Sequence, residues 1–209
     1  MHVTHNTNGR WRLPSTLRWW PSAARQIGRT FVLWTVIAAA MTPVAAQSPT
    51  APVINREYAI KAAFLYHFLN YVEWPAEAFA EETSPFVIGV HGTNPFGNAL
   101  NQIAKDKKVR NRSIEVRSLS SAGQVGKCHI LFVPKSVPVP VQAAVLKSAR
   151  DSHILTVGES DDFIDRGGAA QFFLEGNKVR FAFNTDAINS KNLKASAKLL
   201  ALATIASDK

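Results

Sequence analysis

Cysteine is nearly absent from this chain, because Cys128 is the only one among 209 residues. An intramolecular disulfide therefore cannot form, whatever compartment the protein occupies. A strand-like run, residues 129–133, follows Cys128, and this context favours a small, buried, apolar side chain. An intermolecular disulfide and a reactive thiol are the two alternatives, and only the odd cysteine count supports them.

Acidic residues are absent from the first 46 positions, which contain five arginines. The net charge of +9 arises largely there, because the other 19 of the 24 basic residues face 15 acidic ones, a balance of +4. Such a balance is ordinary for a globular surface and argues against nucleic-acid binding. Apolar residues make up 46% of the chain, enough to bury a core.

A hydrophobic run of membrane-spanning length is missing near the N-terminus. Residues 31–41 are about eleven residues of apolar sequence, whereas a spanning helix needs roughly 20. Val44 and Ala46 supply the small side chains that a signal peptidase requires, and no Arg-Arg pair favours the twin-arginine route. We therefore predict a secretory signal over residues 1–46, cleaved after Ala46, with Sec export to the periplasm.

Patterns for metal binding, nucleotide binding and catalysis are also missing. No two of His67, His91, His129 and His153 stand at the i, i+4 spacing of metal ligands. Residues 92–97 have the glycine spacing of a phosphate-binding loop but lack its Lys and Ser or Thr, and the acidic cluster 161–165 lacks the glycine and glutamate of a calcium loop. We predict no metal, no cofactor and no enzymatic activity.

Short apolar runs alternate with amphipathic segments along the rest of the chain. Apolar side chains recur at three and four over residues 57–72, which predicts a helix ending at Trp74-Pro75. Residues 86–90 are continuously apolar, as in a strand buried on both faces of a parallel sheet. Further strands are predicted over 113–119, 130–133 and 153–157, and further helices from Pro95 to about residue 105 and over 141–150.

The C-terminal third predicts a hairpin and a long final helix. Residues 169–174 and 179–184 form two strands around a four-residue turn, and 186–206 carry an apolar stripe at helical spacing. Lys191, Lys194 and Lys198 fall opposite that stripe, as a solvated face or as a surface for an acidic partner or anionic lipid. The fold class is α/β: a single-domain layered αβα sandwich with a mostly parallel central sheet and a C-terminal antiparallel hairpin.

Four residues are candidates for ligand or partner binding. Arg180 interrupts an apolar strand, so it either points outward or belongs to a pocket for an acidic group. Asn94 stands at a predicted helix start, where backbone amides can bind an anion, although a tight turn with a helix cap is the simpler explanation. Gly167 and Gly168 form either a partner-facing loop or a turn that needs positive φ.

Several segments together resemble the YfiR family of small periplasmic regulators, in order from about residue 57 to residue 203. The segments are residues 61–66 and 71–75, residues 88–90 with 94–97, residues 128–132, residues 155–158 with Phe163 and 167–168, and residues 179–181 with Asn184 and 193–196. On this basis residues 56–207 are predicted to be a YfiR-like domain, preceded by a flexible leader over residues 47–55.

The resemblance implies an α/β sandwich, often a homodimer, with no catalytic residues. It also implies a regulator that represses an inner-membrane diguanylate cyclase by binding its periplasmic sensor region, and that an outer-membrane lipoprotein sequesters. Cyclic di-GMP and biofilm formation would then be the output. The best-known member carries disulfides, which the single Cys128 cannot reproduce. The alternative function is a small-ligand-sensing module that serves a sensor kinase or another membrane receptor.

Overall fold

This structure is a computed structural model that describes residues 52–206, with side chains from Arg56 onward. The predicted secretory signal lies outside the described residues. Residues 52–206 contain the whole sheet and both apolar cores. This segment is therefore a folding unit in its own right.

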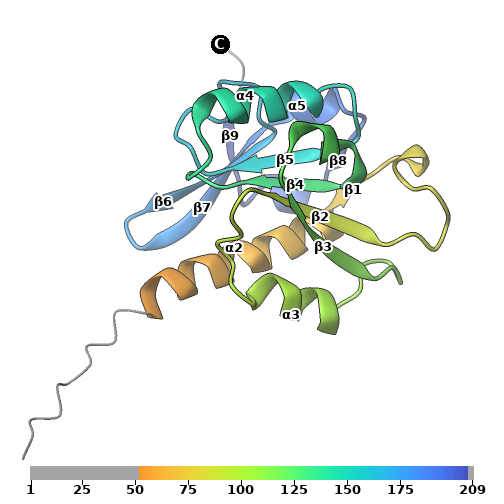
Figure 1. The fold of residues 1–209 in the computed structure, drawn as a ribbon, viewed down its shortest axis with the longest axis horizontal. Coiled ribbons are helices and arrows are strands. Elements are labelled where there is room, and N and C mark those ends of the chain that lie inside the picture. The colour runs from red at the N-terminus through yellow and green to blue at the C-terminus, as the bar shows by residue number, and fades with distance from the viewer. Residues whose placement is uncertain (1–51, 207–209) are drawn as a thin grey trace, which may run out of the picture. The chain divides into compact units, whose positions relative to one another are not determined.

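A seven-stranded sheet in the order β3-β2-β4-β5-β6-β7-β9 is the centre of the fold (Figure 1). The first five strands in that order run parallel, whereas β6 and β7 form an antiparallel hairpin. The strands are β2 (Phe86–His91), β3 (Ile114–Leu119), β4 (Ile130–Val133), β5 (Leu155–Gly158), β6 (Ala170–Glu175), β7 (Lys178–Asn184) and β9 (Thr204–Ala206). The parallel sheet and the hairpin are as the sequence predicts.

Helices cover both faces of this sheet, as Figure 1 shows. One face packs against α2 (Pro52–Tyr71) and α3 (Ala99–Asp106), the other against α4 (Val139–Ser148) and the 3-10 helix η3 (Ala122–Lys127). Alternate residues of each strand face opposite sides: Ile130 and Phe132 join the α2 core, whereas Leu131 and Val133 join the α4 core. The αβα sandwich is therefore confirmed.

Helix α2 is fixed to the sheet by aromatic packing. Leu65, Phe68 and Leu69 are fully buried, and the Phe68 ring lies 5.1 Å from Phe181 and 5.8 Å from Phe172. Burying each such side chain contributes about 1.5–3 kcal/mol. The helix begins at Pro52, five residues before the predicted start and inside the predicted leader, because proline suits the first helical position.

The predicted long C-terminal helix is wrong. The chain instead forms α5 (Thr185–Asn189), β8 (Lys194–Ala195), α6 (Ala197–Leu200) and β9. Asn192 adopts a left-handed φ of 55°, which ends the helical path, and the Ser196 side chain accepts the Leu199 N–H to begin α6. β8 pairs antiparallel with β1 (Val72–Glu73), and β9 pairs parallel with β7.

This break changes the environment of the predicted lysine stripe. Lys191 is only 6% exposed, and its Nζ donates to the backbone carbonyls of Ala149 and Arg150 at the end of α4. A cation is favourable at a helix C-terminus. Lys191 therefore ties two segments together and is not part of a solvated helix face, whereas Lys194 and Lys198 are exposed. No helix within residues 52–206 is long and apolar enough to cross a bilayer.

Candidate functional site

The carboxyl ends of β4 and β5 meet at one edge of the sheet, the edge at which open α/β sheets bind ligands. Side-chain alternation along β5 determines what faces α2 there. Leu155 and Val157 belong to the α2 core, so Glu159, two residues further on, points to the same side. Glu159 is only 7% exposed, and it is therefore a buried carboxylate at this edge.

Lys61 on α2 is the partner of this carboxylate. Its Nζ forms ion pairs with Glu159 and, one helical turn away, with Glu57 at 2.5 Å. Lys61 is 5% exposed and stands four residues before Leu65, in the stripe that α2 turns to the core. A buried charge is tolerated only when it is paired. The pair therefore joins α2 to the sheet edge.

Glu159 has two more donors. The backbone N–H of Lys135, just beyond β4, donates to Oε2 at 3.1 Å, and the Tyr58 hydroxyl lies 3.4 Å from the same oxygen. Burial, and then the negative charges of Glu159 and Glu57, raise the pKa of Tyr58 to about 12, so the phenol stays protonated as a donor. These side chains line a cavity of about 320 Å³.

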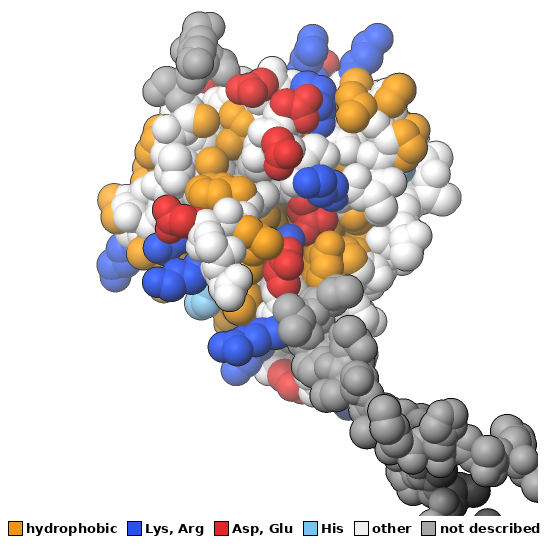
Figure 2. Space-filling model, turned by 90° about the vertical axis from the view of Figure 1, so that its left-hand side faces the viewer, with side chains coloured by type: hydrophobic (Ala, Val, Ile, Leu, Met, Phe, Trp, Pro, Cys, Tyr) orange, Lys and Arg blue, Asp and Glu red, His pale blue; other side chains and the backbone are white. Residues whose placement is uncertain are grey.

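An open groove continues from this cavity between α2 and the β6–β7 hairpin. It has a volume of about 730 Å³ and shares Glu57 and Leu174 with the cavity. Ile60 and Leu174 are apolar but 38% and 53% exposed. Figure 2 faces this side of the domain, where acidic and basic side chains gather between hydrophobic ones. We call this surface, lined by Arg56, Glu57, Ile60, Phe64, Leu174 and 176–180, the hairpin groove.

Arg180 lines the hairpin groove. Its side chain is 49% exposed, and its Nε lies 3.0 Å from the Glu175 carboxylate across the hairpin. An exposed pair of this kind adds little stability, so Arg180 has no evident structural task. Arg180 therefore points outward from the strand and lines the rim of a recess, and the alternative of a pocket for an acidic group stays a prediction.

Asn94 lies near the same sheet edge but does not begin a helix. Its Oδ1 accepts the Phe96 N–H at 2.9 Å in a local turn, and α3 starts only at Ala99. The predicted helix start at Pro95 is therefore wrong. The N–H of Phe96, the residue after Pro95, is bound to the Asn94 side chain in this turn. Phe96 contacts the Tyr58 ring edge-on at 5.6 Å, which connects the Asn94 turn to the cavity.

Gly167 and Gly168 lie on the other side of the sheet, in the loop before β6. Gly167 has a φ of 92°, as a turn requires. A Cβ on Gly168 would meet the Phe163 ring at 2.3 Å, and Phe163 belongs to the α4 core. The structure therefore places Asn94 beside the cavity next to α2 and Arg180 at the rim of the hairpin groove, on the strand face opposite to Val179 and Phe181, whereas the two glycines shape a turn on the α4 side.

The remaining polar candidates have structural surroundings. Burial raises the pKa of the Cys128 thiol to about 12, and the side chain is 7% exposed, which confirms the prediction of a buried residue. Within residues 52–206, no three His, Cys, Asp or Glu side chains cluster as metal ligands.

Sequence reasoning missed Glu159 and the role of Lys61. The available signal was a lysine in the buried stripe of an apolar helix, which requires a buried partner.

Comparison with known proteins identifies the family. The YfiR/HmsC-like family model matches residues 58–204, most of the chain. The chain belongs to this family. YfiR/HmsC-like proteins are regulatory, generally non-enzymatic and typically periplasmic. The resemblance that the sequence motifs indicated is therefore confirmed over residues 58–204 of the described domain.

The similarity to solved structures supports the fold and nothing beyond it. A conserved domain protein from Vibrio cholerae has a TM-score of 0.50 at 12% identity, covering 73% of this chain and 60% of its own length. This chain therefore spans about 60% of that protein. A phosphoglycerate oxidoreductase from Rhizobium etli has a TM-score of 0.31 at 14% identity over 52% of each chain, which is too low to support an argument. No curated protein matches the chain.

Proposed function

We propose that this chain is a periplasmic regulator that binds the periplasmic part of an inner-membrane sensor through the hairpin groove. The sensor is a diguanylate cyclase, and binding represses it and lowers cyclic di-GMP. The observation that carries this proposal is membership of a regulatory, generally non-enzymatic family. A recess that exposes apolar side chains at the edge of the domain supports it, since exposed apolar patches mark interaction sites.

The groove favours a partner of particular chemistry. Ile60 and Leu174 offer an apolar floor, and Arg56, Lys178 and Arg180 provide basic groups along it. Glu57 is engaged by Lys61 and Glu175 by Arg180, so among the described residues Arg56 and Lys178 are left without a carboxylate partner. The groove therefore suits a segment with an apolar anchor flanked by acidic residues.

A pull-down tests the proposal. Residues 47–209, carrying a photo-crosslinker in the groove, are incubated with solubilised envelope, and cross-linked proteins are identified. We expect an inner-membrane protein with a cytoplasmic cyclase domain, and a rise in cyclic di-GMP when the gene is deleted. A kinase or transporter in its place, or unchanged cyclic di-GMP, would contradict the repression of a cyclase.

Two surface variants provide a matched comparison. Leu174→Asp introduces a charge into the hairpin groove, whereas Leu202→Asp does the same at a leucine that is 69% exposed and does not line it. We expect only Leu174→Asp to abolish cross-linking and to raise cyclic di-GMP as the deletion does. Equal effects of the two variants would show that the groove is not the binding surface. An outer-membrane lipoprotein that sequesters the regulator would compete for the same cross-links.

The second candidate is a small-ligand sensor for a membrane receptor. It is favoured by the cavity of about 320 Å³ around Glu57, Tyr58, Lys61 and Glu159 at the carboxyl edge of the sheet. A thermal-shift screen of small polar metabolites tests this candidate. Stabilisation that disappears in a Tyr58→Phe variant supports it, and a screen without any stabilising compound contradicts it.

A further inference from the structure

A second recess lies at the opposite, amino-terminal edge of the sheet. It has a volume of about 570 Å³ and is walled by the rings of Trp74, Phe79 and Phe86 and by Arg110 and Arg112. The remaining lining residues are Ala76, Glu82, Thr83 and Asn111, of which Glu82 is the only acid and is exposed. This aromatic recess is independent of the hairpin groove, with which it shares no lining residue.

Hydrogen-bond donors at this edge lack acceptors. Trp74 is only 7% exposed, and its Nε1 has no hydrogen-bond partner among the described residues. His129 accepts the Val87 N–H at Nδ1, so the proton of its neutral ring is on Nε2, which has the Ala78 carbonyl near it but no hydrogen bond of normal geometry among the described residues. Both rings pack against Phe86, at 5.5 and 5.1 Å. Unpaired buried donors are rare and call for an explanation.

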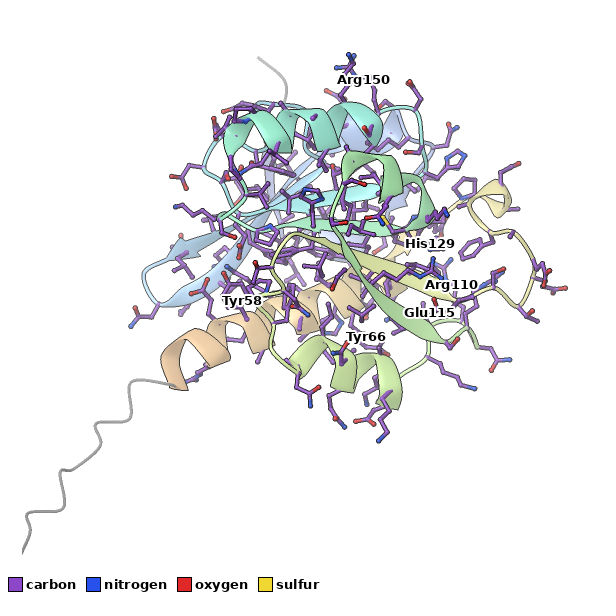
Figure 3. All side chains as sticks on the ribbon, viewed as in Figure 1. Tyr58, Tyr66, Arg110, Glu115, His129 and Arg150 are labelled. Carbon is purple, nitrogen blue, oxygen red and sulfur yellow. The ribbon has the colours of Figure 1, made fainter. Side chains whose placement is uncertain are left out.

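The two arginines of the recess also lack carboxylate partners. Neither Arg110 nor Arg112 has an acidic oxygen within 4 Å in the described part of the chain, and both instead donate to backbone carbonyls. Arg112 also lies 4.0 Å from the centre of the Phe79 ring. Arg110 has a left-handed φ of 47°, an uncommon backbone for arginine. Figure 3 shows Arg110 and His129 at the end of the sheet opposite to Tyr58.

We propose that the aromatic recess binds a small organic anion with a flat apolar body. The carboxylate, sulfonate or phosphate of the ligand accepts hydrogen bonds from the guanidinium groups, which are strong when both partners are charged. Its flat body packs against the Phe79 and Trp74 rings. The proposal assigns a ligand class to a surface that has an excess of donors and aromatic area, the two features that fix and hold small ligands.

Trp74 provides a site-specific probe. The other four tryptophans of the chain precede residue 47, so the protein of residues 47–209 has a single indole N–H. Its resonance is followed in ¹H–¹⁵N spectra while benzoate is added. We expect a saturable shift. Benzylamine has the ring without the negative charge, and acetate has the charge without the ring, so both bind at least about tenfold more weakly.

Arg110→Asn is the decisive variant, because asparagine tolerates left-handed φ. We expect benzoate binding to weaken about tenfold. The matched control is Arg117→Gln, which also removes one positive charge but from an exposed arginine that pairs with Glu115 outside the recess. We expect this control to bind benzoate as the unchanged protein does.

A third variant keeps the proposal testable if Arg110→Asn does not fold. Glu82 is exposed, so Glu82→Gln leaves the core intact while removing the negative charge at the recess. It is expected to tighten benzoate binding about twofold. An unmoved indole resonance, equal binding of benzoate and benzylamine, or equal effects of the Arg110 and Arg117 variants would overturn the proposal and leave the proposed regulatory function untouched.

Discussion

The two ends of the parallel strands both bury polar side chains, but they satisfy them differently. At the carboxyl edge, Lys61 and Glu159 form a pair with every charge engaged. At the amino edge, Trp74 and His129 bury donors that have no partner among the described residues. A buried group without a partner costs about 1–3 kcal/mol. The Lys61–Glu159 pair at the first edge is therefore a structural joint, whereas the second edge keeps buried donors without partners.

Removing a buried charge at the carboxyl edge should cause the largest loss in the free energy of unfolding. Lys61→Met leaves Glu159 buried without its counter-ion, and we expect a loss of about 3–5 kcal/mol in the free energy of unfolding. Urea denaturation of residues 47–209 measures it. Lys135→Met is the control, because the Lys135–Asp161 pair is exposed and should contribute less than about 0.5 kcal/mol. Equal losses in the two variants would mean that the buried Lys61–Glu159 pair stabilises the fold no more than the exposed Lys135–Asp161 pair does.

Lowering the pH tests the amino edge. Burial lowers the pKa of His129 to about 4, against 6.5 for the free side chain, although the Ala78 carbonyl favours the charged ring without forming a normal hydrogen bond to Nε2. The unfolded chain thus binds more protons between these values. The stability due to neutral His129 is complete above pH 6.5 and is lost as the pH falls to 4, by about 3 kcal/mol.

Denaturation at pH 7 and pH 4 measures this loss. His129→Phe keeps the ring and removes the titration, so its stability should fall less over the same interval. His91, whose pKa burial also lowers, is unchanged in both proteins and cancels in the comparison. Parallel pH profiles for the two proteins would mean that His129 is not the group that titrates.

The smallest effect is expected from the unpaired indole itself. Trp74→Phe loses ring area but also removes a buried donor that lacks an acceptor, and the two changes offset each other to within about 1 kcal/mol. Trp74→Ala removes the whole ring and should cost about 3–5 kcal/mol. Urea denaturation compares the variants. A large loss for Trp74→Phe would mean that the indole N–H has a partner, and the contrast between the two edges would disappear.

Local patterns predicted most of the elements that build the sheet. Continuous apolar runs predict β2 and β4, and the Gly176-Asn177 turn predicts the hairpin, because each signal lies within one element. The prediction of one long final helix was wrong, although Ile188 and Leu199 have helical spacing and are both buried. Their spacing arises from two short helices, and the periodicity of a single sequence does not reveal the break between them.

The candidate site was predictable only in part. Arg180 was selected because a charge interrupted an apolar strand, and it does line a recess. Glu159 was not selected as a candidate, because it follows Gly158 in a polar loop and nothing in the local sequence indicates that it is buried. Its partner Lys61 is 98 residues away in the chain. Such a pair becomes visible only when α2 lies against the carboxyl edge of β5.

The sequence by itself determined the α/β class, the hairpin, the burial of Cys128 and the family, since these depend on residue types and on spacing within single segments. Tertiary structure alone decided which polar groups find partners. Lys61 and Glu159 meet, Lys191 reaches the end of α4, and Trp74 finds no acceptor among the described residues. The physical reason is that burial and pairing depend on contacts between distant segments, which hydrophobic periodicity does not encode.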